Sequence, residues 1–277
     1  MTDTEYPIEP LKEIVRMLSG AVDTSRYEET FLRKTIAMRL AATGMRSLTA
    51  YAMHLAGDRL EAEEFRRSLR INHSDFFRNP LTFAVIEQWI LPALVREKMN
   101  SGGGGIRVWS AGCATGQEAW SLAMLLEELS GPVSYRIFAT DLADPGQARA
   151  GVYSADAVGN VRTRHLREYF SRQDDSFSIV PRLRARVDFS DHDLLDDDSA
   201  SPAASIYGDF DLILCCNLLF YYRPEARRQI LDKVCHVLLP GGYFVTGEVE
   251  RAMVAAHEGL CSVAPPAAVF QTDSRRK

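Results

Sequence analysis

Hydrophobic residues recur at helical spacing through residues 1–92 of the chain. One such stripe, at positions i, i+3, i+4 and i+7, consists of Leu11, Ile14, Val15 and Leu18. Ser47 is suited to cap the amino end of a helix, because its hydroxyl oxygen can accept a backbone N–H. We expect helices over residues 11–18, 27–42, 48–55, 61–71 and 81–90, which together would form an N-terminal helical domain with a linker helix.

From residue 106 onward, short apolar runs alternate with helical stretches. Strands are expected over residues 106–110, 135–140, 210–216 and 242–247, and helices over 117–129, 144–150 and 224–238. Such an alternation is typical of an α/β fold with a doubly wound sheet. The glycine-rich run 101–105 precedes the first strand. We therefore expect two domains, residues 1–92 and 93–277.

The alternation lapses between Val152 and Asp193. Residues 164–170 have a helical pattern. Residues 176–180 and 183–189, on either side of Pro181, have the pattern of short strands.

The turn after the first expected strand carries the clearest chemical signal. Gly112 and Gly116 separate the apolar run 106–109 from the helical stretch that begins at Gln117. A tight strand-to-helix turn presents backbone N–H groups and a helix N-terminus to a ligand. Asp141 ends the second expected strand, at a spacing that suits hydrogen bonds from a ribose diol. The pattern favours an adenosine ligand and disfavours a dinucleotide; an ordinary turn and a helix-capping Asp141 are the alternatives.

Further motifs surround this turn. Taken in chain order, the motifs are Asn72–Arg78, Trp109–Glu118, Ala139–Asp141, Phe189–Leu195 and Phe210–Tyr222. In these segments the chain resembles the CheR-type protein-glutamate methyltransferases, which use S-adenosylmethionine (SAM). The resemblance runs from the N-terminal helices to the last strand.

The resemblance implies a Rossmann-like methyltransferase sheet, with a small antiparallel β-subdomain inserted over about residues 152–192. It also implies SAM as cofactor and S-adenosylhomocysteine as product. Asp193 would read the adenine amino group, and Leu194 would pack on the ring. Glu118 could bind the methionine ammonium group, with a favourable charge at a helix start as the alternative. The expected cofactor-binding residues are Asn72, Ser74, Arg78, Gly112, Gly116, Glu118, Asp141, Asp193, Leu194 and Asn217.

Arg78 and Tyr221 are the candidate catalytic residues. A glutamate has an ordinary pKa of about 4, so its carboxylate is already an anion at neutral pH and needs no general base. The Arg78 guanidinium can hold the acceptor carboxylate or the carboxylate of the cofactor. Tyr221 follows an expected strand, at the edge where α/β sheets bind ligands. From position alone, a surface ion pair for Arg78 and a core role for Tyr221 are the alternatives.

The substrate-facing segments depart from the family pattern. Cys216 stands where the family usually has arginine, and Glu248 and Val249 replace a His-Ser pair before a glutamate. Lys34 and Arg39 are what remains of a basic second helix, which we expect to dock an acidic acceptor. The expected function is methylation of glutamates on an acidic helical chemoreceptor or similar signalling protein. The alternatives are a different acceptor on the same fold, and a cofactor-sensing protein without catalysis.

Composition narrows the choice of partners and compartment. The formal net charge of −5 over 277 residues disfavours a nucleic-acid partner. Five cysteines without framework spacing fit a reducing cytoplasm, and no Cys/His cluster has metal-site spacing. No run approaches the roughly 18 apolar residues that span a bilayer, and the amino end lacks a secretion signal. We expect a monomeric cytoplasmic protein without a metal or membrane insertion.

Overall fold

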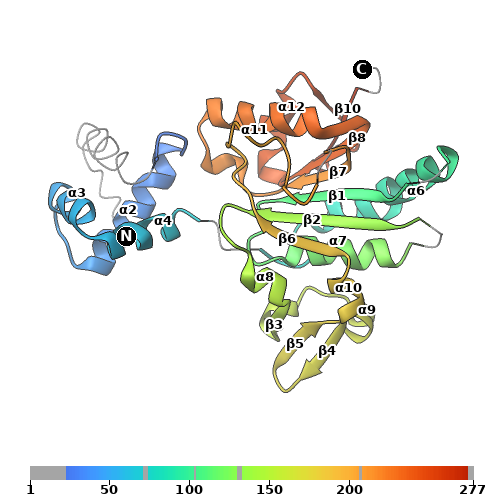
Figure 1. Ribbon diagram of the computed structural model, residues 1–277, viewed down its shortest axis with the longest axis horizontal. Helices are drawn as coiled ribbons and strands as arrows, with labels where there is room; N and C mark the ends of the chain where they lie inside the picture. The colour runs from blue at the N-terminus through green and yellow to red at the C-terminus, as the bar shows by residue number, and fades with distance from the viewer. Residues whose placement is uncertain (1–22, 71–73, 103, 130–132, 206–207, 274–277) are drawn as a thin grey trace. The chain divides into compact units, whose positions relative to one another are not determined.

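Figure 1 shows the protein as a computed structural model, which describes residues 23–70, 74–102, 104–129, 133–205 and 208–273. The chain divides into two compact units, residues 1–71 with 220–227 and residues 72–219 with 228–277. The sequence placed residues 72–92 in the N-terminal domain, whereas the structure groups them with the larger unit. The helix expected at 11–18 lies outside the described residues.

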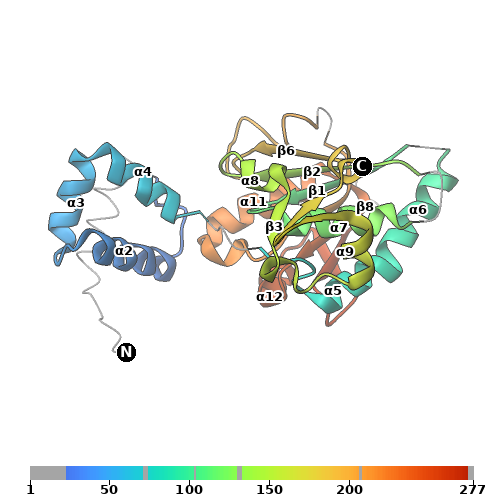
Figure 2. The ribbon, with the colours of Figure 1, turned by 90° about the horizontal axis from the view of Figure 1, so that it is seen from below.

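The smaller unit contains α2 (Glu29–Thr43), α3 (Leu48–Gly57) and α4 (Arg59–Ser68), which Figure 2 shows from below. The side chains of Leu32, Ile36 and Leu40 are buried at four-residue spacing, as on one face of an amphipathic helix. Ser47 caps α3, because its hydroxyl oxygen accepts a hydrogen bond from Ala50 N at 3.3 Å. The cap expected from the sequence is therefore confirmed.

Arg39 of α2 is bound to Glu61 of α4 inside this unit. Its Nε and Nη2 atoms donate to the two carboxylate oxygens at 3.0 and 2.6 Å, and the Tyr51 hydroxyl donates to Glu61 at 2.7 Å. Burial raises the pKa of Glu61, but the hydrogen bonds from Arg39 and Tyr51 bring it below its ordinary value. The Arg39 and Glu61 side chains are only 18% and 8% exposed. The charge of Arg39 thus serves helix packing, and its expected part in docking stays a prediction.

The larger unit is built on a seven-stranded sheet with the order β6–β2–β1–β7–β8–β10–β9. Its strands are β1 (Ile106–Ala111), β2 (Tyr135–Asp141), β6 (Val187–Asp191), β7 (Phe210–Cys215), β8 (Leu238–Thr246), β9 (Leu260–Ser262) and β10 (Val269–Thr272). The first five strands in this order are parallel, and β10 is antiparallel to both of its neighbours. The predicted Rossmann-like α/β fold is confirmed.

Helices of the larger unit surround this sheet. They are α5 (Pro80–Val85), η1 (Ile86–Ile90), α6 (Leu91–Asn100), α7 (Gln117–Glu127), α8 (Gly146–Ala150), η2 (Asp156–Val158), α9 (Thr163–Tyr169), α10 (Pro181–Arg184), η3 (Leu219–Tyr221), α11 (Pro224–Val237), η4 (Glu248–Glu250) and α12 (Arg251–Ala255). The first residues of α11 and the last two of η3 belong to the smaller unit.

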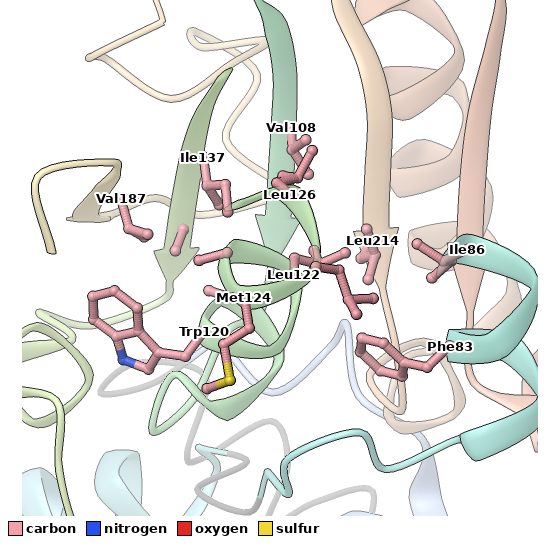
Figure 3. Packing of buried hydrophobic residues seen from close by; sticks show 14 of the residues in the cluster. Phe83, Ile86, Val108, Trp120, Leu122, Met124, Leu126, Ile137, Val187 and Leu214 are labelled. Carbon is pink, nitrogen blue, oxygen red and sulfur yellow. The ribbon is translucent and has the colours of Figure 1, made fainter. Parts of the chain in front are cut away.

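Both faces of the central strands are apolar. Figure 3 shows the α7 residues Leu122 and Leu126 facing strand residues such as Val108, and all three belong to one buried cluster. Side chains alternate along a strand, so the next residue, Trp109, lies on the opposite face, where its ring is 5.5 Å from that of Phe210. A sheet covered on both faces explains the nearly continuous hydrophobic runs of its strands.

A second sheet consists of the antiparallel strands β3 (Val152–Ser154), β5 (Ser176–Ile179) and β4 (Phe170–Gln173), visible below the main sheet in Figure 1. The segment 183–189 does not join it. Residues 181–184 form α10, and β6 instead pairs in parallel with β2 at the edge of the main sheet. The strand expected over 183–189 is thus wrong in its bounds, because a short apolar run does not by itself indicate where its pairing begins or which strand it joins.

Candidate active site

The loop between β1 and α7 folds closely over the end of β2. Gly112 and Gly116 have φ angles of +79° and +91°, which side-chain-bearing residues rarely adopt. A Cβ atom on Gly112 would lie 2.8 Å from Leu218, and one on Gly116 would lie 2.7 Å from Ala148. Both glycines are therefore required by backbone conformation, and Gly116 is also required by space, because the Ala148 backbone lies close to it.

Asp141, at the end of β2, is tied to this loop. Its carboxylate accepts hydrogen bonds from Ala114 N at 2.8 Å and Leu142 N at 2.9 Å. These bonds fix the direction of the half-buried side chain. Carboxylate oxygens can each accept more than one hydrogen bond, so the same group can also bind ligand hydroxyls.

Asp193 and Leu194 follow β6, and the chain pairing brings them to the end of β2. His192 N donates to the backbone oxygen of Asp141 at 2.8 Å, which anchors the start of this segment. Asp193 accepts from Leu195 N at 2.9 Å, and Leu194 is buried. Residues that are far apart in sequence are therefore neighbours at the carboxyl ends of β2 and β6.

Glu118 is a half-buried carboxylate at the start of α7. The Ser110 hydroxyl donates to it at 2.8 Å. Burial raises the pKa of Glu118 to about 6; hydrogen bonds from Cys216 and Ser110 oppose this shift, Glu250 adds to it, and the positive charge of Arg78 also opposes it. The Glu118 carboxylate is therefore held by hydrogen bonds and keeps a raised pKa.

Cys216 supplies a protonated thiol rather than the usual family cation. Burial, with the carboxylate of Glu118 next in importance, raises the pKa of Cys216 well above its ordinary value. A thiol that keeps its proton can donate to Glu118 but carries no positive charge.

The turn that carries Arg78 is held in place by two contacts of the preceding residue, Phe77, one through its backbone amide and one through its ring. Phe77 has a φ of +52°, an unusual conformation for a residue with a side chain. Its amide donates to the Ser121 hydroxyl at 3.1 Å, and its ring stacks on buried His165 at 5.5 Å. Strain of this kind persists only where surrounding structure enforces it. The backbone before Arg78 is therefore fixed by packing.

Glu250 joins two loops of the site, a role that the sequence interpretation missed. Its Oε2 accepts from Asn217 N, Thr246 Oγ1 and Gly247 N, each at 2.8 Å. Its Oε1 accepts from Leu219 N at 2.6 Å. The fully buried carboxylate thus ties the end of β7 to the end of β8. The available signal was a glutamate three residues after Gly247, the spacing of a capping box.

Asn217 lies two residues after the last residue of β7 and has a φ of +59°. Its side-chain oxygen is buried and has no hydrogen-bond partner among the described residues. Its Nδ2 would lie only 2.7 Å from a Cβ atom on Gly247. An enclosed acceptor without a protein donor fits a ligand that supplies the donor.

Tyr221 lies in η3 and packs against the smaller unit's α2. Its ring meets Phe31 edge-on, with centroids 4.7 Å apart, and its carbonyl accepts from Glu28 N at 2.8 Å. Tyr221 is grouped with the smaller unit, whereas Arg78 belongs to the larger one. Ser74 is half-buried in the segment before Phe76, and Asn72 lies outside the described residues.

No metal site is formed by the described part of the chain, because no group of three or more of its His, Cys, Asp or Glu side chains is arranged to hold a metal ion. Within the same residues, no helix is long and apolar enough to cross a membrane.

The family model described as the CheR methyltransferase SAM-binding domain matches residues 72–264. A chemotaxis protein methyltransferase of Listeria innocua is 32% identical over 87% of this chain and 89% of that protein. Chemotaxis protein methyltransferase 1 of Pseudomonas aeruginosa is 33% identical over 66% of this chain and 67% of that protein. A 104.1 kDa protein of Rhodobacter capsulatus is 31% identical over 97% of this chain, which spans only 29% of its length.

The matched region contains the loop with Gly112 and Gly116, the aspartate directed by backbone amides, and the buried Asn217 oxygen that has no donor among the described residues. The match to this domain gives SAM as the cofactor. The expectation of a non-catalytic sensor is set aside by the same matches. The chain belongs to the CheR methyltransferase family and is a SAM-dependent methyltransferase.

Proposed function

We propose that this methyltransferase acts on glutamate side chains of a chemoreceptor or similar signalling protein in the cytoplasm, forming methyl esters. The observation that carries the proposal is the half-buried Glu118 carboxylate, which accepts from the Ser110 hydroxyl at 2.8 Å and whose pKa the positive charge of Arg78 helps to lower. We assign this carboxylate to the cofactor's ammonium group and the Arg78 guanidinium to an acceptor carboxylate. The names of the Listeria and Pseudomonas relatives support the same acceptor class.

The cofactor-binding roles follow the chemistry of each group. We assign Glu118 to the ammonium group, Asp141 to the ribose hydroxyls, and the buried oxygen of Asn217 to a donor of the cofactor. Gly112 and Gly116, which have no side chains, leave room for the cofactor at the loop. Asp193 and Leu194 are assigned to the adenine, and Asn72, Ser74 and Arg78 to the methionine end.

SAM supplies a methyl group on a positively charged sulfur, an activated electrophile. The protein must therefore align an acceptor oxygen with that methyl and exclude water, rather than remove a proton. Arg78 can hold the acceptor carboxylate through two N–H groups, which fixes the direction of one oxygen. We assign the Tyr221 hydroxyl a secondary orienting role at the acceptor.

We further propose that an acidic helical acceptor docks on a monomeric enzyme through the N-terminal helices. Lys34 of α2 is exposed, whereas Arg39 is committed to Glu61. Arg46 and Arg70 are also exposed, and Arg33 and Arg67 pair with Glu29 and Glu64 within their own helices. Few unpaired charges predict weak docking that salt weakens further.

The direct test uses SAM labelled in its methyl group and the purified cytoplasmic part of a chemoreceptor. The expected product is a base-labile protein methyl ester that disappears when the acceptor glutamates are changed to glutamine. Label that stays on the protein after base treatment would contradict a carboxylate acceptor. Base-labile label that forms only when a small carboxylic acid replaces the receptor would instead favour a small-molecule acceptor.

A further inference from the structure

A cavity of about 950 Å³ lies at the amino-end edge of the main sheet. Asp209, which precedes β7, and Leu238, which begins β8, both line it. Gly112 and Asp141 instead follow the carboxyl ends of strands parallel to these. The cavity is therefore at the opposite edge of the sheet from the cofactor-binding loop.

Cys235, His257 and Asp232 form a connected group in this cavity. His257 Nε2 lies 2.9 Å from Asp232 Oδ1, and Cys235 Sγ lies 3.9 Å from His257 Nδ1. Asp232 and Cys235 are three residues apart on α11, so they share one face of the helix. The His257 side chain is 13% exposed and that of Asp232 is 63% exposed. The imidazole thus lies between a solvated carboxylate and a half-buried thiol.

Two contacts determine which ring nitrogen of His257 carries the proton. Gly259 N donates to Nδ1 at 3.2 Å, so Nδ1 bears a lone pair, and Nε2–H donates to Asp232. Nδ1 is also the atom that faces the Cys235 thiol and can accept its proton. The Asp232 carboxylate would stabilise the imidazolium ion that results. The Gly259 amide donates to the same Nδ1 lone pair and competes with the thiol for it. Proton transfer from Cys235 to His257 is therefore only partial.

We propose that Cys235 is a nucleophilic thiol that reacts with small, soft carbon electrophiles entering this cavity. In this site His257 is the base and Asp232 orients and stabilises it. A thiol next to a base reacts faster because the thiolate, not the thiol, is the nucleophile. The proposal is independent of the methyl acceptor.

The covalent step balances without an oxidant. The Sγ proton moves to His257 Nδ1, and a sulfur electron pair forms a bond to the electrophilic carbon. With iodoacetamide as the electrophile, the carbon–iodine bond breaks and iodide leaves with its electron pair. His257 then releases the proton to water, which restores the neutral ring.

The test measures alkylation of each cysteine in the full, folded chain by limiting iodoacetamide at pH 7, resolved by peptide mass spectrometry. Cys261 of β9 is exposed and serves as the comparison thiol in the same molecule. We expect Cys235 to react about tenfold faster than Cys261, a modest increase because proton transfer is partial. His257→Gln should bring Cys235 to the Cys261 rate, and Asp232→Asn should give an intermediate rate.

Cofactor binding should be unchanged in both variants, because the cavity is separate from the cofactor loop. Thermal melting checks that His257→Gln is folded; if it is not, the Asp232→Asn change at an exposed carboxylate provides the same comparison. The proposal is overturned if Cys235 reacts no faster than Cys261. It is also overturned if Cys235 keeps its full rate in the folded variants.

Discussion

The cofactor loop and the helices of the smaller unit use their charged residues in opposite ways. In the loop, Asp141 is held by backbone amides and Glu118 by a serine hydroxyl, so both carboxylates are positioned yet able to accept a ligand. In the helices, the Arg39 guanidinium is bound by Glu61, and Arg33 pairs with Glu29. A charged residue on a helix therefore does not by itself indicate a docking surface, because an ion pair within the unit can neutralise its charge.

The largest effect is expected at Arg78. Arg78→Ala should lower the single-turnover rate of methyl transfer at saturating SAM by a hundredfold or more, since positioning and electrostatic contacts contribute about this much. Tyr221→Phe should lower it less, because the hydroxyl only assists. Rapid-quench measurement of labelled product checks both. A normal rate in Arg78→Ala would remove its orienting role.

Arg39→Ala tests the interior of the smaller unit. Removing one partner of a buried ion pair leaves the Glu61 carboxylate uncompensated and should lower the free energy of unfolding of this unit by about 3 kcal/mol. The pKa of Glu61 is depressed in the folded state, so the contribution of the pair is present above the ordinary pKa and is lost as the pH falls through the folded value. Denaturant unfolding at pH 7 and at lower pH measures both effects.

A matched control is Arg67→Ala, which removes an exposed pair with Glu64 whose side chains are 63% and 41% exposed. Exposed pairs contribute little, so this variant should unfold nearly as the parent protein does. Equal destabilisation by the two changes would mean that the buried position of Arg39 has no special role.

Glu118 predicts a pH dependence with a definite sign. Its pKa rises from 4.5 to about 6 in the folded protein, so ionising it above pH 6 costs about 2 kcal/mol relative to the unfolded chain. Glu118→Gln should therefore stabilise the ligand-free protein at pH 8 by up to about this amount. SAM affinity should fall as the pH drops below 6, because the ammonium group needs the carboxylate.

Calorimetric titration with SAM from pH 5 to 8 checks this linkage. The parent protein should lose affinity by roughly tenfold per pH unit below pH 6, if one proton must leave for binding. Glu118→Gln should bind weakly at every pH and show a flat profile. A flat profile in the parent protein would place the ammonium group elsewhere.

The smallest effect is expected at the acceptor-docking surface. Lys34→Glu should reduce methylation of a protein acceptor severalfold at low salt, with the difference shrinking at high salt because exposed charges are screened. Cofactor affinity should not change. Arg96→Glu, at an exposed position of α6 in the larger unit, is the matched control. Equal rates for parent protein and Lys34→Glu at low salt would exclude α2 as the docking surface.

The main sheet could be predicted because its strands are buried on both faces and alternate with helical runs. The position of β6 was harder, because nothing local in Val187–Asp191 distinguishes pairing with β2 from pairing within the small sheet. The positions of Gly112 and Gly116 in the turn and of Asp141 at the strand end could be predicted for a local reason: the turn needs left-handed backbone and the acid ends a strand.

Other features depend on contacts that sequence spacing does not reveal. Arg39 meets Glu61 across 22 positions, and Glu250 meets Asn217 across 33. Neither contact can be recognised in the sequence, because only the fold brings the two residues together. The thiol of Cys216 beside Glu118 has the same origin, because β7 and α7 are adjacent only in the folded chain.

The most direct test of the account is one paired measurement on two variants, the SAM dissociation constant by calorimetry and the single-turnover rate at saturating SAM. Asp141→Ala should weaken SAM binding by about 1–3 kcal/mol through lost hydrogen bonds to buried hydroxyls, while the saturated rate stays near that of the parent protein. Arg78→Ala should show the opposite balance, with the rate lowered far more than SAM binding, which loses only the contact assigned to the methionine end. If both variants lost binding and rate in the same proportion, cofactor binding and acceptor orientation would not be separate functions of these residues, and the account would be contradicted.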